Sequence, residues 1–255
     1  MWTTHSTGFN GTTFHYLGTG FHLCQDALMD KKTPRRARRE ESLSKERIIE
    51  AAIDILDRTG ESGLTFRALS DMLATGPGAI YWHIDNKNDL LTAACDAIVA
   101  RTVQAGAAGA APKDAIRALA LDLFDAMEAH PWAGSALIRA GGQLPVVRVL
   151  ECLGRQVQAL GVPPQAQWLT VSALLHFILG VGGQNAANMQ RVCGDGVARG
   201  DLLDQVAADW SRLSPVDYPF ARSMAGQLRI HDDRADFLAG VDLILNGIGV
   251  IAAQA

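Results

Sequence analysis

Apolar residues first recur at helical spacing between positions 48 and 56. Intervals of three and four residues are typical of a helix with one buried face, so they predict an amphipathic helix here. Ser44 is placed to cap its N-terminus, Glu46 lies in the first turn, where a carboxylate opposes the helix dipole, and Gly60 is placed to end it. The repeating residues are Ile48, Ile49, Ala52, Ile53 and Leu56.

A second, shorter helix follows, and Thr65 marks its start. A threonine at this position can accept a hydrogen bond from a backbone N–H of the first turn that has no partner within the helix. The pattern predicts Leu69, Met72 and Leu73 on the inner face and an end near Ala74.

A third helix is predicted directly after a tight turn at Thr75 and Gly76. Pro77 suits its first position, because the N–H that proline lacks would have no intrahelical partner there. Ile80 and Ile84, four residues apart, predict its buried side. The residues left for the outer face or its flanks are Pro77, Gly78, Ala79, Tyr81, Trp82 and His83.

Further helices predict an all-α protein with a three-helix head and a helical-bundle body. Asn86 and Asp89 form a capping pair for a fourth helix, whose apolar stripe ends at Ile98. An Ala/Gly-rich boundary follows residue 105. Amphipathic helices are then predicted near 113–129, 143–160, 165–190, 219–229 and 234–252, with a looser segment over 191–218.

The composition favours helices and leaves the function open. The chain is 48% hydrophobic and 20% charged, and Val, Ile, Thr and aromatic residues dominate no run. The net charge of -4 is unevenly spread: residues 31–101 hold 12 Lys and Arg against 11 Asp and Glu, whereas residues 102–255 hold 11 against 14. A negative total does not exclude DNA binding, because phosphate contacts depend on where the positive charge lies.

Two short helices joined by a tight turn, with an aromatic and basic exposed end on the second, describe a helix-turn-helix motif. A recognition helix must fit the major groove, be braced from behind by apolar residues, and offer polar and aromatic groups to bases and phosphates. The predicted second and third helices meet these requirements. We therefore interpret residues 44–90 as a helix-turn-helix DNA-binding domain.

A family resemblance rests on residues 64–91, LTFRALSDMLATGPGAIYWHIDNKNDLL. This run resembles the head of the tetracycline-repressor (TetR) family, in which a Tyr-Trp-His or similar triplet precedes an Asn-Lys or Ser-Lys start of the next helix. With residues 44–63 the resemblance covers about 44–91. The HPW at 130–132 and the closing FLAGVDLILNGI resemble the family's ligand-binding bodies more weakly. The resemblance implies a transcriptional repressor whose operator affinity falls when a small-molecule effector binds; activation stays open.

The resemblance also implies roles at matching positions. Thr65 would touch a phosphate, Arg67 a guanine edge or a phosphate, and Lys87 a phosphate. Tyr81, Trp82 and His83 would lie against backbone and bases. Taken singly, these aromatic side chains also fit core positions, and His83 and Lys87 also fit a solvated surface.

The start of the recognition helix departs from the family pattern. Where many relatives carry polar groups, Gly76, Pro77, Gly78 and Ala79 carry no side-chain hydrogen-bonding group. We therefore expect sequence to be read by Arg67, by Tyr81, by apolar contact of Pro77 or Ala79 with thymine methyl groups, and by DNA shape.

The N-terminal residues predict an extension in front of the head. Residues 1–30 lack a basic start followed by a long apolar run, so we expect a flexible segment rather than a secretory signal; Met29 is an alternative start. Residues 31–39 carry six positive charges and predict a basic arm for phosphates or a minor groove, with a solvated tail as the alternative. The expected domains are 1–43 for the flexible extension, 44–90 for DNA binding and 91–255 for ligand binding and dimerisation.

The body is expected to form a homodimer and to bind the unknown effector. Paired heads double the contact with a two-fold symmetric operator, and the helices near 165–190 and 234–252, which are rich in glycine and aliphatic residues, are the interface candidates. A core position is the alternative for each residue. Candidate lining of the ligand pocket consists of Trp132, Trp168, His176, Phe177, Gln184 and Asn185.

Other classes of protein have little support in the sequence. His231 with Asp232 and Asp233 resembles a pair found in metal-dependent phosphohydrolases, but no other histidine completes that pattern. No P-loop, G-x-S-x-G or zinc spacing occurs, so we expect no enzyme, cofactor or metal. Four distant cysteines and polar interruptions of the apolar runs predict a cytoplasmic protein without a membrane span. A dimeric DNA-binding protein without a small-molecule effector remains the alternative function.

Overall fold

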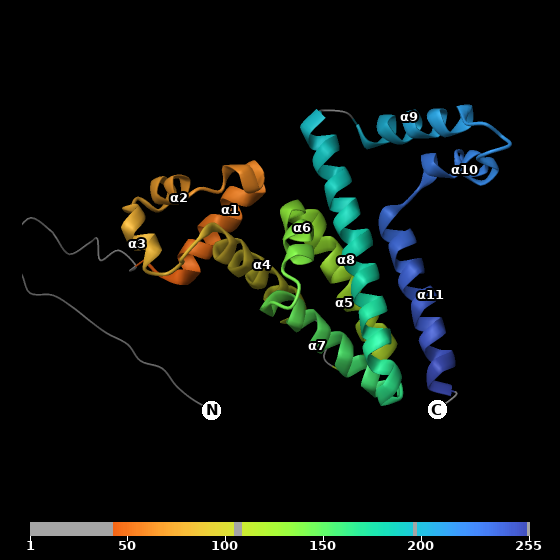
Figure 1. Ribbon diagram of the computed structural model, residues 1–255, viewed down its shortest axis with the longest axis horizontal. Helices are drawn as coiled ribbons and strands as arrows, with labels where there is room; N and C mark the ends of the chain where they lie inside the picture. Colours follow the sequence, from red (N-terminus) through yellow and green to blue (C-terminus); the bar gives the residue numbers. More distant parts are fainter. Residues whose placement is uncertain (1–42, 105–108, 196–197, 254–255) are drawn as a thin grey trace, which may run out of the picture. The chain divides into compact units, whose positions relative to one another are not determined.

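The computed structural model describes residues 43–104, 109–195 and 198–253, except for the side chains of residues 192–195. In this part of the chain every regular element is a helix (Figure 1). The all-α prediction is confirmed. The bounds of the elements are α1 Lys45–Gly63, α2 Phe66–Leu73, α3 Pro77–Tyr81, α4 Lys87–Gln104, α5 Pro112–Ala129, α6 Pro131–Arg139, α7 Leu144–Ala159, α8 Pro164–Asp195, α9 Arg199–Arg212, α10 Pro219–Met224, the 3-10 helix η1 Gln227–Ile230 and α11 Asp233–Ala253.

The ends of the head helices follow from local capping. The Ser44 hydroxyl accepts from the Arg47 N–H at 3.3 Å, and the Thr65 hydroxyl accepts from the Ala68 N–H at 3.1 Å. Gly60, with φ of 66°, breaks the regular path of α1 close to its end. Two reciprocal hydrogen bonds join Asn86 and Asp89 at the start of α4. The Asp89 N–H donates to Asn86 Oδ1 at 2.9 Å, and Asn86 Nδ2 donates to Asp89 Oδ2 at 2.8 Å. The predicted starts and capping pairs are confirmed, whereas the predicted end at Gly60 was wrong, because α1 continues beyond the kink to Gly63.

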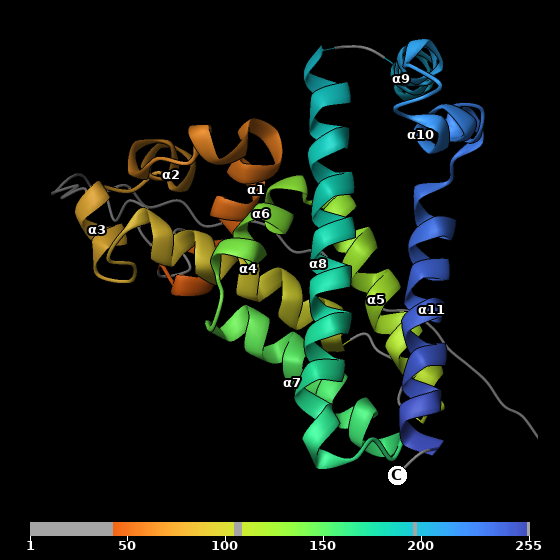
Figure 2. The same cartoon turned by 45° about the vertical axis from the view of Figure 1, so that its right-hand side comes forward.

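The body is built around α8, which packs against α5, α6, α7 and α11 (Figures 1 and 2). Its core includes Phe124, Leu153, Leu174 and Val241, each at most 2% exposed. Burial raises the pKa of the Cys95 thiol to about 12, so this cysteine stays protonated and packs as an apolar side chain.

Two ion pairs fix neighbouring body helices at their solvent edges. Arg148 of α7 donates to Asp96 of α4 at 2.6 Å, and Arg117 of α5 donates to Asp242 of α11 at 2.6 Å. In both pairs the hydrogen bond to the carboxylate raises the pKa of the arginine. Because both pairs are partly exposed, their main effect is to fix the orientation of the helices rather than to stabilise the fold strongly.

Three details of the predicted helices were wrong. The segment 191–218 was expected to be loose, but it contains α9, and the helix α6 after Pro131 was not predicted. Met72 was expected on the inner face of α2 but is 41% exposed, because α2 is only eight residues long and packs through Leu69 and Ser70. In each case the deciding contacts come from elsewhere in the chain.

α9, α10 and η1 lie beyond one end of α8 and α11 (Figure 2). Arg229 of η1 pairs with Asp204 of α9 at 3.0 Å, and Arg199 of α9 pairs with Asp233 at the start of α11. Arg222 of α10 donates to the Leu213 carbonyl at 2.9 Å. Polar contacts therefore tie this segment to the start of α11.

Two helices are long and apolar enough to cross a membrane by length and composition alone: α8 over Pro164–Arg191, and α11. No such segment was predicted from the sequence, because His176 interrupts the first apolar run and Asp242 and Asn246 interrupt the second. Both helices pack in the bundle, and a core helix of a bundle passes the same test. Their length therefore gives no support to a membrane location.

Candidate nucleic-acid interface

α3 is braced from behind by apolar side chains of its own neighbourhood. Ile80 is 0% exposed, Ile84 4% and Leu69 of α2 0%. Ile48 and Leu56 of α1 belong to the same core. This support leaves most of the outer side of a five-residue helix exposed, as a helix entering a DNA groove requires.

Three large or polar side chains project from the C-terminal end of α3 and the turn after it. Trp82 is 89% exposed, Tyr81 is 52% exposed, and His83 is also exposed. The Tyr81 ring stacks on the Phe66 ring of α2, with centroids 4.4 Å apart and an angle of 10° between the planes. This stack fixes the direction of Tyr81 while its edge stays accessible. An indole as exposed as Trp82 has no structural role in the described residues.

The residues at the mouth of α2 are exposed as well. Thr65 uses its oxygen lone pair in the cap, and its hydroxyl proton remains available for a phosphate oxygen. Arg67 is exposed, and its guanidinium forms no ion pair with the described residues. Pro77 is exposed and Ala79 is half-buried at the start of α3. These positions agree with contact to DNA.

Lys87 has a contact that the sequence did not predict. Its ammonium donates to the backbone carbonyl of Glu61 at 2.5 Å and so ties the start of α4 to the last turn of α1. The side chain remains exposed, so a phosphate could share the same charge. Lys87 therefore has a structural contact as well as a position suited to DNA. The basic arm at 31–39 lies outside the described residues.

Half of the expected ligand-pocket residues meet in one cavity. Phe177, Gln184 and Asn185 of α8 line a cavity of about 310 Å³ together with residues at the start of α11. The other three lie elsewhere: Trp132 is buried beside Asp57, Trp168 is 73% exposed at a different cavity of about 370 Å³, and His176 is exposed on α8.

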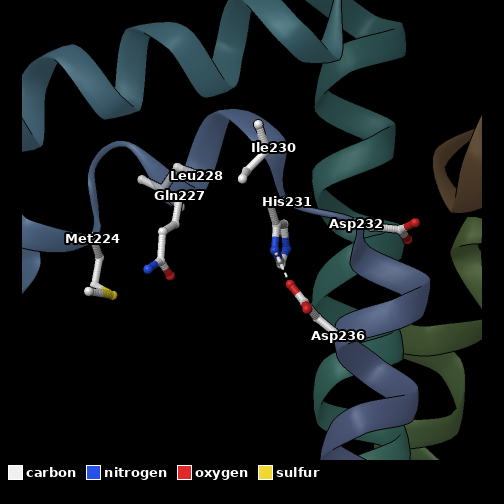
Figure 3. A pocket seen from close by; sticks show the side chains of 7 residues that line it. All are labelled: Met224, Gln227, Leu228, Ile230, His231, Asp232 and Asp236. Atoms are coloured by element: carbon white, nitrogen blue, oxygen red, sulfur yellow. Dashed lines mark ion pairs between the residues drawn. The ribbon is translucent and has the colours of Figure 1, made fainter.

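The cavity also has titratable lining residues that were not predicted, namely His231, Asp233 and Asp236. The His231 ring contacts Asp233 at 2.8 Å through Nε2 and Asp236 at 2.5 Å through Nδ1. Figure 3 shows His231 and Asp236 pointing toward each other while Asp232 points away, at an adjoining cavity of about 440 Å³. The sequence signal was the His231-Asp232-Asp233 run, which was considered only as a metal motif. Among the described residues no three His, Cys, Asp or Glu side chains are arranged to hold a metal ion.

Comparison with known proteins agrees with this arrangement. Residues 48–94 match the model of a family described as bacterial regulatory proteins, tetR family. The transcriptional regulator SCO7222, a TetR from Streptomyces coelicolor, is 50% identical; the match covers 82% of this chain and 99% of that one, with a TM-score of 0.74.

Two further proteins are similar to this chain over different lengths. An HTH-type transcriptional regulator from Saccharopolyspora erythraea is 32% identical over 101 residues, which are 40% of this chain and 43% of that protein. The chain thus spans less than half the length of this curated relative. A crystal structure of BioQ with its double-stranded DNA operator is 26% identical, covers 81% of this chain and 98% of that one, and has a TM-score of 0.56.

The fold and the exposed α2–α3 surface define a helix-turn-helix protein with a helical C-terminal domain. The chain belongs to the TetR family of bacterial regulatory proteins.

Proposed function

We propose that this chain is a dimeric transcriptional repressor that binds double-stranded operator DNA through residues 44–90 and loses affinity for it when a small-molecule effector binds residues 91–255. The observation that carries the proposal is α3, with Tyr81, Trp82 and His83 exposed in front of buried Ile80 and Ile84. DNA in the cytoplasm is the expected target, and no enzymatic step is part of the proposal.

The contacts with DNA are proposed to be uneven along α3. Tyr81, Trp82, His83, Thr65 and Lys87 supply phosphate and backbone contacts, which set the register on the duplex. Base reading falls to Arg67 and Tyr81 and to thymine methyl groups against Pro77 or Ala79, with DNA shape supplying the rest. The basic arm at 31–39 would add phosphate or minor-groove contacts.

Dimerisation is proposed through α8 and α11. Leu169, Leu243 and Val250 are 69%, 74% and 57% exposed in the single chain. A Cβ added at Gly180 of α8 or Gly247 of α11 would meet nothing within 4 Å, so these positions leave space for a second helix to approach closely. Burial of this apolar surface would favour a dimer. Two heads about 34 to 36 Å apart, or a multiple of that, would reach successive major grooves on one face of DNA.

The effector signal is proposed to reach the head through the contacts of α6 with α1. Asp57 of α1 accepts from Trp132 Nε1 at 2.7 Å and from His130 Nδ1 at 2.8 Å, and Glu61 accepts from Ser135 at 3.1 Å and from Arg139. A ligand that prefers the arrangement with displaced heads would lower DNA affinity by no more than its preference between the two arrangements.

The proposal is tested by selecting bound fragments from random DNA, with the chain begun at Met1 and at Met29. A defined operator is expected from both, because both keep residues 31–39, and a further variant without residues 31–39 is expected to bind it more weakly. Arg67→Ala should cost about 1 to 3 kcal/mol of binding free energy and relax one operator position. Arg155→Ala is the matched control, because Arg155 pairs with Glu151 on α7.

Two results would contradict the proposal. If Arg67→Ala keeps the same operator and the same affinity, Arg67 does not read DNA. If a broad panel of small molecules neither raises the melting temperature of the protein nor releases it from the operator, the effector is excluded and the chain is a DNA-binding protein without one.

A further inference from the structure

The cavity between α8 and the start of α11 has an aromatic wall. The rings of Phe177 and Phe237 stack with centroids 5.7 Å apart and 17° between their planes. Gly240 makes this possible, because a Cβ at that position would lie 2.2 Å from the Phe177 ring. Aromatic faces attract flat rings by stacking and cations by electrostatics.

A buried amide in the same cavity has no partner. Asn185 is only 7% exposed, and no described residue forms a hydrogen bond with its side chain. No polar side-chain atom that is sealed from solvent lacks a partner in the described part of the chain, so this amide opens into the cavity that Asn185 lines. An amide in this position takes its hydrogen-bond partner from whatever fills the cavity, which is water or a ligand. Asn185 is therefore available to a ligand independently of the charged groups.

The charged groups of the cavity favour a positive ligand. Asp233 is shared between Arg199 and His231, whereas the recorded ion pair of Asp236 is with His231 alone. Asp236 is 62% exposed, and its other oxygen makes no contact with the described residues. With His231 neutral, the two carboxylates outnumber the positive charge of Arg199, and such a site repels an anion and attracts a cation. The absence of a three-ligand metal cluster in the described residues excludes the simplest inorganic cation site.

We infer that this cavity binds an organic cation with a flat apolar body, which stacks on Phe177, bonds the Asn185 amide, and places its amine against Asp236. The inference rests on the proposed function only for its regulatory meaning, because the occupant would be the effector. Binding between α8 and the first turn of α11 would act on two helices proposed to form the dimer.

The test uses three probes with one ring system: 2-naphthylmethylamine, 2-naphthylmethanol and 2-naphthoate. Titration calorimetry on the full chain without DNA should show the amine binding most tightly and the carboxylate least. Asp236→Asn should weaken the amine about 5- to 20-fold and leave the alcohol unchanged. Asn185→Leu should weaken the amine and the alcohol together.

Asp204→Asn is the matched control. Asp204 is 64% exposed and holds a single recorded ion pair with Arg229, like Asp236 with His231, but it lines none of these cavities. Its substitution should change no affinity. Equal binding of the amine to wild type and Asp236→Asn would overturn the inference. So would binding of 2-naphthoate as tight as that of the amine. The same holds if none of the probes binds even at millimolar concentration. If Asp236→Asn fails to fold, the order of the three probes on the wild-type protein decides.

The result is separate from the proposed regulatory role. Binding of the amine with no selected operator would keep the site and reject the DNA-binding proposal. Operator binding with no amine binding would reject the site alone.

Discussion

Trp82 of the head is 89% exposed on the turn after a five-residue helix, whereas Asn185 of the body is 7% exposed on a helix of 32 residues. The head presents the side chains proposed to contact DNA on a small braced element, and the body holds those proposed to bind the effector between long helices. Around α3, buried Ile80 and Ile84 give support while Trp82 and His83 face solvent, whereas Thr65 and Lys87 combine a structural contact with an exposed position. Substitutions can therefore test the head and the body separately.

The largest effect is expected from removing the support of α3. Ile80→Ala should lower the free energy of unfolding by about 2 to 5 kcal/mol, because Ile80 is fully buried and a cavity would remain. Ile230→Ala, at an 83% exposed isoleucine, should change it by less than about 0.5 kcal/mol. Urea denaturation measures both. A small effect of Ile80→Ala would show that α3 is not held by its buried side.

A smaller effect is expected at the junction of head and body. Trp132→Phe keeps an aromatic ring but removes the hydrogen bond to Asp57, and should lower the free energy of unfolding by about 1 to 3 kcal/mol. Operator affinity should change too, although Trp132 lies on α6 and not on the DNA-binding surface. Trp168→Phe, at a 73% exposed position, is the control for both measurements. Unchanged DNA affinity would show that the effector signal does not reach the head through Trp132 and Asp57.

The smallest effect is expected at the first turn of α1. Hydrogen bonding to the backbone and to Ser44 lowers the pKa of Glu46. A carboxylate with a lowered pKa in the folded state stabilises the protein above its unfolded pKa, and this contribution is lost as the pH falls through the folded pKa. Glu46→Gln should thus lower the melting temperature slightly at neutral pH and not at all in strong acid. In a Ser44→Ala background this pH dependence should shrink; an unchanged dependence would mean that Ser44 does not contribute.

The head could be predicted helix by helix because its signals are local. Ser44, Thr65, Pro77 and Asn86 stand where the helices begin, since each satisfies or avoids a backbone N–H within three residues. Met72 was wrongly predicted on the inner face because helical periodicity does not show which turns of a short helix pack against another element.

The body was less predictable because its decisive contacts join distant segments. α9 lacks a strong apolar stripe, and its position depends on Arg199 with Asp233 and Arg229 with Asp204. His231 and Asp236 reach the same cavity as Asn185 only because α11 packs beside α8. No spacing in the sequence brings them together, so only part of the expected pocket could be found in advance.

Exposure of Trp82 also has an optical consequence. Indole emission depends on hydration, and among the described tryptophans Trp82 is the most exposed while Trp132 is only 2% exposed. The fluorescence of Trp82 should therefore report on whatever covers the tip of the head, and that of Trp132 on the junction with the body. Of the five tryptophans in the chain, these two therefore mark the tip of the head and its junction with the body.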